Sequence, residues 1–120
     1  MYKYYFEKLH VWQNAREFID EIYLITKSFP DDEKYNLISQ LKRASVSTLV
    51  NLAEGSARNT SKDQAHFTTI SYSSLMEVLA LLTVSKDQGF IQDDKFIEIR
   101  KDLNLIANQL NALKKAQKRA

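Results

Sequence analysis

The polar side chains with the most regular spacing lie between residues 35 and 62, in the segment YNLISQLKRASVSTLVNLAEGSARNTSK. On a helix with about 100° between successive residues, they form one narrow stripe with steps of three or four residues. The stripe consists of Gln40, Arg43, Ser47, Asn51, Glu54 and Arg58. Amide, hydroxyl, carboxylate and guanidinium groups at this spacing can form a ladder of hydrogen bonds along one helix face.

Glu54 and Glu77 are the acids that we expect to be partly buried, on two adjacent helices. Two such carboxylates could be a catalytic pair or half of a metal site. More often, acids in this position pair with arginine or amide groups and stabilise packing, and Arg43 and Asn51 are the candidate partners. We therefore predict a structural polar ladder formed by Gln40, Arg43, Asn51, Glu54 and Glu77.

The motifs of common enzyme classes are missing from the sequence. The chain has no cysteine, which excludes disulfides, thiolate metal sites and cysteine nucleophiles. It has no HExxH motif, no pair of glutamate-plus-ExxH motifs from two helices, no glycine-rich phosphate loop and no GxSxG elbow. His10 and His66 lie on different elements and are predicted to be surface or capping residues. We expect no enzymatic activity, no catalytic residue, no metal site and no cofactor.

The composition fits one globular domain, because 44% of the 120 residues are hydrophobic and 27% are charged. The N-terminal segment MYKYYFEKLHVW carries charges throughout, so it does not resemble a signal peptide. No apolar stretch approaches the length needed to cross a membrane. Together with the absence of cysteine, this predicts a cytoplasmic protein with no membrane partner.

The hydrophobic spacing predicts four helices, and the chain has few turn residues that would favour strands. Their expected ranges are about 11–29, 32–57, 62–88 and 94–117. Pro30 and Gly89 should end the first and third helices, and Gly55 is a plausible left-handed C-terminal cap of the second. Ser61 is the expected N-cap of the third helix. Residues 1–120 should form a single all-α domain, an antiparallel up-down-up-down four-helix bundle.

Two of these helices carry apolar residues on more than one face. On the second helix, one stripe consists of Leu37, Leu41, Ala44, Thr48 and Leu52, and a second consists of Val46, Val50 and Ala57. On the third helix, Tyr72, Met76, Leu79 and Ala80 lie opposite the core face. A single bundle would leave the second faces partly in water, and exposed patches of this kind usually mark an interface. We expect a homo-oligomer that assembles through the second and third helices.

The N-terminal aromatic residues Tyr2, Tyr4, Tyr5 and Phe6 have two interpretations. We favour an aromatic arm that closes one end of the core over a platform on which nucleic-acid bases stack.

Basic residues form two groups in the sequence that point to a nucleic-acid partner. The first group, in the tail KKAQKRA, consists of Lys114, Lys115, Lys118 and Arg119. The second group, expected around one end of the second helix and the turn beyond it, consists of Lys42, Arg43, Arg58 and Lys62. Such charges contact phosphates without reading bases. The alternative function is a protein-interaction scaffold, in which the polar ladder and the aromatic arm dock a partner polypeptide and no nucleic acid binds.

Three segments resemble one known family: FEKLHVWQNAREF, ITKSFPDDEKYNLISQLKRASVSTLVNLAEGSAR and SYSSLMEV. They are similar to the four-helix-bundle proteins encoded in intervening sequences of bacterial large-subunit ribosomal RNA genes. That family also resembles the accessory proteins of diversity-generating retroelements, which are pentameric bundles that bind nucleic acid and a reverse transcriptase. The resemblance implies a bundle that assembles as a pentamer, with an RNA or DNA partner and without enzymatic activity.

Overall fold

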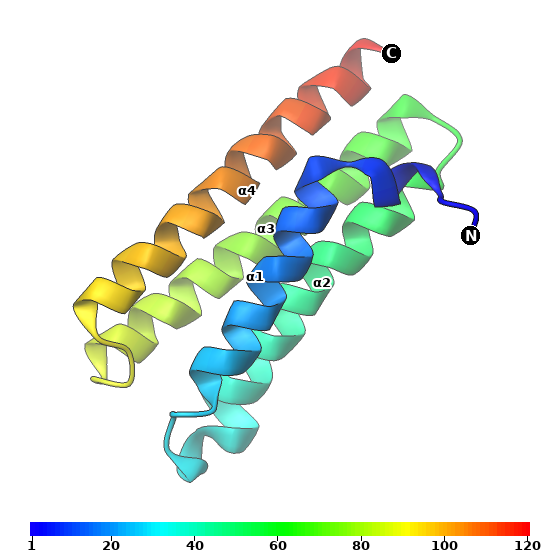
Figure 1. Cartoon of the computed structure of the whole chain (residues 1–120). Helices are drawn as coiled ribbons and strands as arrows, with labels where there is room; N and C mark the ends of the chain where they lie inside the picture. Colours follow the sequence, from blue (N-terminus) through cyan, green and yellow to red (C-terminus); the bar gives the residue numbers. More distant parts are fainter.

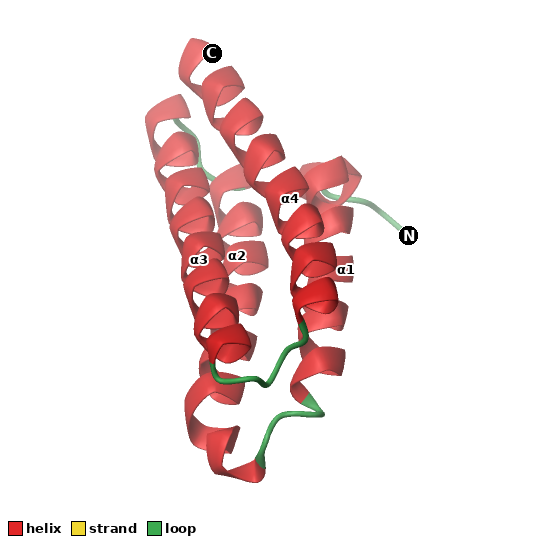
Figure 2. Ribbon diagram, turned by 90° about the vertical axis from the view of Figure 1, so that its left-hand side faces the viewer, coloured by secondary structure: helices red, strands yellow, loops and turns green.

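The chain forms four long antiparallel helices, and a computed structural model describes all residues from 1 to 120 (Figure 1). In chain order the elements are η1 (Tyr5–Lys8), α1 (His10–Thr26), η2 (Asp31–Glu33), η3 (Lys34–Ile38), α2 (Ser39–Ser56), α3 (Ser61–Asp87) and α4 (Asp93–Arg119). Each long helix packs against the next one, and α1 also packs against α4, which closes the bundle (Figure 2). The predicted fold, an all-α up-down-up-down bundle, is confirmed.

The core lies where the predicted apolar stripes of the four helices meet. The first stripe of α2 is buried, since Leu37, the most exposed of its members, is only 6% accessible. On α4 the heptad positions from Phe96 to Leu110 are buried, and they meet Ile22 of α1 and Leu75 of α3. Burying an aliphatic or aromatic side chain stabilises a fold by about 1.5–3 kcal/mol, so these stripes supply the main driving force for the bundle.

The first connection differs from the expected one, because α1 ends at Thr26 and α2 begins at Ser39. Residues 27–29 form a tighter turn, in which the Phe29 N–H donates to the Thr26 carbonyl over 3.1 Å. Bonds of this i,i+3 type replace the α-helical pattern in a last helical turn. A 3₁₀ turn and a π-helical turn then lead from Asp31 to Ile38, where the sequence predicted a regular helix.

The end of α3 follows the expected glycine stop. Gly89 has a φ of 82°, a left-handed conformation that a residue without a Cβ adopts at little cost. Its N–H donates to the Lys86 carbonyl, and the Phe90 N–H donates to the Ser85 carbonyl, both over 2.9 Å. These two bonds form a Schellman motif, which satisfies carbonyls that the helix end leaves free.

Gly55 has a different role from the predicted one. It lies inside α2, is buried, and has no left-handed conformation. A Cβ at this position would lie 2.9 Å from the Cβ of Phe67 and 3.3 Å from the carbonyl oxygen of Gln64, both on α3. Gly55 therefore allows the backbones of α2 and α3 to approach closely. The N-cap of α3 also differs, because Thr60 rather than Ser61 accepts the Asp63 N–H, over 3.1 Å.

Helix α3 is long and apolar enough, by length and composition alone, to cross a membrane. This corrects the expectation that no stretch of the chain approaches that length. In the monomer 33% of the apolar window is buried, and the core helices of globular proteins meet the same criterion. Helix α3 meets the criterion because it carries apolar residues on more than one of its faces.

A pair of carboxyl groups lies where α1 packs against α4. Glu21 Oε2 is buried without a hydrogen-bond partner. It lies at a small cavity of about 90 Å³ whose lining residues are Asn14, Glu17, Phe18, Glu21, Asp102 and Leu105. The pKa of Glu21 is raised from 4.5 to about 7, first by burial of the carboxyl group and then by the hydrogen bond and the negative charge of the neighbouring Asp102. Glu98 has a smaller effect in the same direction, and the Lys95 ammonium lowers the pKa.

The raised pKa predicts that the bundle loses stability as pH rises through neutrality. A folded-state pKa above the unfolded value means that the folded protein binds the proton more tightly, so the stabilisation is complete below about 4.5 and is lost by about 7. Glu21→Gln keeps the neutral form at every pH. Thermal unfolding at about pH 5 and about pH 8 should show a fall of several degrees in wild type that Glu21→Gln largely removes.

The matched control for this measurement is Asp20→Asn, at an exposed acid on α1 that does not line this cavity. It should retain the pH dependence of wild type. An unchanged pH dependence in Glu21→Gln would contradict the assignment of the proton to the α1–α4 contact.

The close contact at Gly55 predicts that Gly55→Ala destabilises the fold. Alanine is favoured over glycine in a helix interior by about 1 kcal/mol, so an unconstrained position would gain stability. Here the new methyl group meets Phe67 and Gln64, and overpacking of this kind costs about 1–3 kcal/mol. Chemical denaturation should show a net loss, and a variant more stable than wild type would contradict the contact.

Candidate functional site

An open groove lies where α3 begins and α4 ends, at the top of the molecule in Figure 1. It has a volume of about 460 Å³, and its lining residues are Ser61, Lys62, Ala65, His66, Thr69, Lys114 and Lys118. We call it the basic groove. Lys62 and His66 lie one turn apart on α3, and Lys114 and Lys118 lie one turn apart on α4. The two pairs therefore line the groove from two antiparallel helices.

Three contacts hold the two helix ends in this arrangement. The Thr68 hydroxyl donates to Gln117 Oε1 over 2.7 Å, which links α3 to α4. The Ser61 hydroxyl donates to the carbonyl of Ala120 over 3.1 Å. On the other side of α3, the Gln64 side-chain amide donates to the Arg58 carbonyl over 3.1 Å and fixes the preceding turn. The basic groove is thus part of the packed structure.

The chemistry of the basic groove favours an anion with several oxygen atoms. Three ammonium groups and one imidazole line it together with two hydroxyls, and none of its lining residues is a carboxylate. The first turn of α3 also presents the positive end of a 27-residue helix. Phosphate groups match this combination of charge and hydrogen-bond donors, and such contacts carry no sequence information.

The structure brings together three of the predicted nucleic-acid residues, taken from both groups of the sequence analysis. Lys62 comes from the second group, and Lys114 and Lys118 come from the tail. Lys115 and Arg119 are exposed on α4 but do not line the basic groove. Residues from the tail group and from the second group therefore line one groove in the folded protein, although they are separate in the sequence.

The remaining residues of the second group lie elsewhere. Arg58 lies over the ring of Phe67, with its guanidinium carbon 4.3 Å from the ring centroid. Lys42 lies over the ring of Tyr23 at 4.7 Å, and Arg43 is exposed. Because a helix rises about 1.5 Å per residue, Lys42 lies about 21 Å from the last residue of α2, Ser56, and Arg58 lies beyond that end. The expectation that they cluster around one end of this helix is wrong.

The polar ladder is only partly present. The Asn51 side-chain amide donates to the Ser47 carbonyl over 2.9 Å and to the Ser47 hydroxyl over 3.0 Å. The Ser47 hydroxyl lies 2.9 Å from that of Ser74, which links α2 to α3. The Gln40 amide instead donates to Asn36 Oδ1 over 2.8 Å, one turn earlier. The short hydroxyl groups, rather than the longer acids, connect the two helices.

The acids and the arginine of the predicted ladder take no part in it. Glu54, Glu77 and Arg43 are exposed, and none has a side-chain hydrogen bond or an ion pair within the chain. The expectation that Glu54 and Glu77 are the partly buried acids is therefore wrong, and Glu21 has that position instead. The single ion pair of the chain joins Lys95 to Glu98 within α4, over 3.6 Å.

Sequence reasoning missed three residues of the basic groove: Ser61 as a donor, His66 and Thr69. The i,i+4 spacing of Lys62 and His66 indicates that they share a helix face, and the same spacing applies to Lys114 and Lys118. The sequence did not indicate that these two faces meet, because that depends on the register of α3 against α4. No group of three or more His, Asp or Glu side chains lies close enough to hold a metal ion.

The N-terminal aromatic arm is divided between two environments. Phe6 packs edge-to-face on Trp12, with ring centroids 4.5 Å apart, and is half-buried. The expected role in covering the core therefore applies to Phe6. Tyr2, Tyr4 and Tyr5 remain exposed, with accessible fractions of 77%, 62% and 64%.

Comparison with solved structures places the fold among known bundles. A crystal structure from Bacteroides thetaiotaomicron, described as a protein of unknown function from the S23 ribosomal protein family, aligns with a TM-score of 0.80. It is 20% identical, and the alignment covers 88% of this chain and 95% of that one. No match was found among curated proteins. The family model described as 23S rRNA-intervening sequence protein matches residues 7–112. The chain therefore belongs to the 23S rRNA-intervening sequence protein family.

Proposed function

We propose that this protein is a non-enzymatic, oligomeric four-helix bundle. It binds RNA or DNA by contacting the phosphate backbone of the nucleic acid. The observation that carries the proposal is the basic groove, where Lys62, Lys114 and Lys118 gather without a neighbouring carboxylate in the lining. The exposed Lys115 and Arg119 extend the positive charge along the end of α4. Such a site neutralises phosphates and releases their counterions, which is the main source of sequence-independent affinity.

The charge of one chain is modest, with a formal net value of +2 at pH 7. Binding by a single copy should therefore be weak and sensitive to salt. Assembly would bring several basic grooves together, and the fields of neighbouring charges add over a Debye length. Oligomerisation is thus part of the proposed function.

The outer faces of α2 and α3 support self-association. Val46, Val50 and Val84 are 36%, 45% and 45% exposed, and Met76 and Ala80 lie on the same side of α3 as Val84. Except for Met76, which packs partly against the core, these residues lie outside the core of the monomer, so their burial against a second copy would add apolar stabilisation. A closed cyclic assembly is the simplest arrangement for such a surface, and we propose a pentamer.

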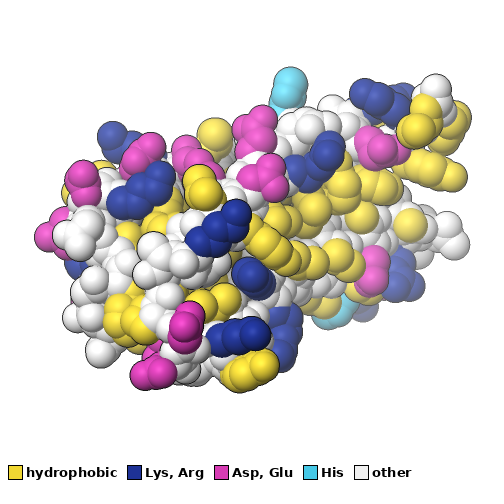
Figure 3. Space-filling view, turned by 60° about the horizontal axis from the view of Figure 1, so that its bottom comes forward, with side chains coloured by type: hydrophobic (Ala, Val, Ile, Leu, Met, Phe, Trp, Pro, Cys, Tyr) yellow, Lys and Arg dark blue, Asp and Glu magenta, His cyan; other side chains and the backbone are white.

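An apolar strip on α1 favours a second candidate function, the docking of a polypeptide. Ile19, Tyr23 and Leu24 line a shallow groove of about 420 Å³ together with Asp20 and Lys27. Figure 3 shows hydrophobic side chains reaching the surface over one face of the molecule, with charged groups around them. A protein scaffold would use this surface independently of the basic groove.

The phosphate proposal predicts that neutralising the basic groove weakens RNA binding. The triple variant Lys62→Gln, Lys114→Gln, Lys118→Gln should bind a single-stranded RNA more weakly than wild type does. Loss of three phosphate contacts should reduce the slope of log K against log salt by about 2, since each contact contributes about 0.7 for single strands. Fluorescence anisotropy at several salt concentrations measures both quantities.

The matched control replaces three exposed lysines far from the basic groove: Lys27→Gln, Lys34→Gln and Lys101→Gln. It changes the net charge equally and should retain most of the affinity. Equal losses in the two triple variants would show that only overall charge matters. Absence of binding by wild type at low salt would refute the nucleic-acid proposal.

The assembly proposal predicts that Val50→Glu lowers the mass of the particle in solution. The new carboxylate would be desolvated only in the assembled state, so the fold of the monomer should persist. Light scattering should show smaller particles, whereas circular dichroism should show similar helical content. Ile97→Glu, at a 56% exposed position on α4, is the matched control and should leave the mass unchanged. A wild-type monomer at micromolar concentration would contradict the proposal.

A further inference from the structure

Three tyrosines of the N-terminal arm are exposed and lie outside the hydrophobic core. We call Tyr2, Tyr4 and Tyr5 the tyrosine arm; more than half of each residue is accessible to solvent. Tyr2 and Tyr4 lie edge-to-face with centroids 5.0 Å apart, and Tyr4 stacks on Phe6 at 6.4 Å with an interplanar angle of 12°. Large aromatic groups normally stabilise a protein by burial, so their exposure here requires another explanation.

The tyrosine arm has a fixed base although its rings are in water. Phe6 packs on Trp12, and the Tyr4 N–H donates to Glu7 Oε2 over 2.8 Å. The Gln13 amide donates to the Glu7 carbonyl over 3.3 Å and ties η1 to α1. No hydroxyl group of the arm donates or accepts a hydrogen bond within the chain. A fixed base lowers the entropy cost of placing these rings against a flat ligand.

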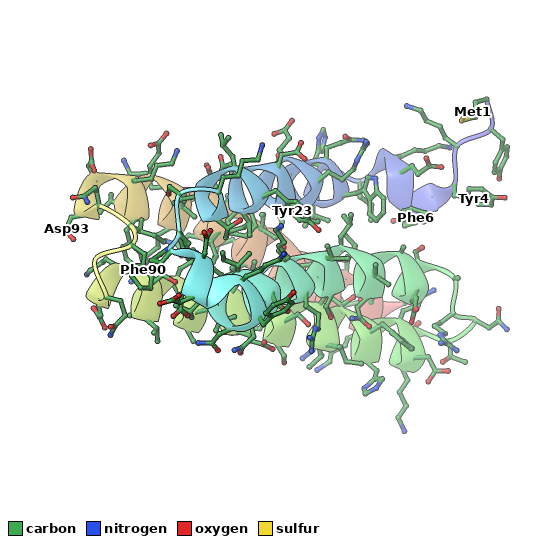
Figure 4. The ribbon with its side chains drawn as sticks, turned by 90° about the horizontal axis from the view of Figure 1, so that it is seen from below. Met1, Tyr4, Phe6, Tyr23, Phe90 and Asp93 are labelled. Atoms are coloured by element: carbon green, nitrogen blue, oxygen red, sulfur yellow. The ribbon has the colours of Figure 1, made fainter.

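The tyrosine arm lies at the same end of the bundle as the basic groove. Tyr5 lines a second groove of about 380 Å³, whose other lining residues are Ser56, Gln64, Leu113, Ala116, Gln117 and Ala120. Ser56 is the last residue of α2, whereas the others lie at the start of α3 and the end of α4, beside the lysines of the basic groove. The two grooves therefore flank one pair of helix ends, and Figure 4 shows Tyr4 and Phe6 at that end.

The two features together fit a nucleic acid with unpaired bases. Positive charges that follow the backbone, combined with aromatic rings on which bases stack, are typical of proteins that bind single strands. A duplex offers its phosphates but keeps its bases stacked inside, so it could use the lysines and not the tyrosines. Lys3 and Lys8 are exposed beside the arm and add positive charge on that side.

We infer that the partner is single-stranded where it contacts this protein, with phosphates in the basic groove and unpaired bases on the tyrosine arm. The inference rests on the proposed nucleic-acid function. It adds that the bases contribute affinity without sequence readout, because every base has a face on which an aromatic ring can stack.

Three probes of equal length, about 16 residues each, test the contribution of the bases: a single-stranded oligonucleotide, the matching duplex and an abasic strand with the same phosphates. The single strand should bind roughly tenfold more tightly than the abasic strand, and the duplex should not exceed the abasic strand. Equal affinity for the single strand and the abasic strand, or tighter binding of the duplex, would overturn the inference and leave the phosphate proposal intact. Absence of binding to all three would instead refute the proposed function.

The double variant Tyr4→Leu, Tyr5→Leu tests the tyrosine arm itself. It should reduce affinity for the single strand to that for the abasic strand, without changing abasic binding or the salt dependence. The control is Tyr35→Leu, an 87% exposed tyrosine in the α1–α2 connection at the opposite end of the bundle, which should bind as wild type does. An equal loss for both probes, or no loss for either, would show that the arm does not stack bases.

Discussion

The close approach of α2 and α3 is the constraint on which the rest of the structure depends. Gly55 has no side chain, and a Cβ at its position would collide with Phe67. Inside the interface, the Ser71 hydroxyl donates to the Thr48 carbonyl over 2.6 Å. Small and hydroxylated residues let two backbones come together and still satisfy their polar groups. This pair of helices forms one half of the bundle, and α1 and α4 bury their own apolar faces against it.

The same contact positions the candidate site. Once α3 is fixed against α2, its first turn lies beside the end of α4, and Thr68 and Gln117 set the register between them. Lysines that are far apart in the sequence then line one groove. Their mutual repulsion is tolerated because the groove is open to water, where exposed charges interact weakly. The positive charge of these lysines is not neutralised by a carboxylate in the lining, so it would be available to a phosphate.

Polar groups in this protein fall into two kinds with different consequences. Ser47, Ser74 and Asn51 satisfy one another between α2 and α3, so they stabilise packing and offer no free chemistry. Glu21 lies between α1 and α4 with its Oε2 atom buried and unpartnered, and its raised pKa makes that contact the pH-sensitive part of the bundle. The exposed lysines and tyrosines are the groups left available to a partner, which is why the proposals concern binding.

The sequence by itself determined the helices and their buried faces. Spacing around Leu41, Leu52 and Leu103 and the stop at Gly89 are local signals, because helical periodicity and turn geometry depend on nearby residues. Only the tertiary structure decided that Gly55 is a contact point, that Glu21 rather than Glu54 or Glu77 is the perturbed acid, and that Lys62 meets Lys118. Burial and proximity depend on which faces of distant helices meet and in what register. A one-dimensional pattern identifies a face, and the packing of its neighbours decides what that face touches.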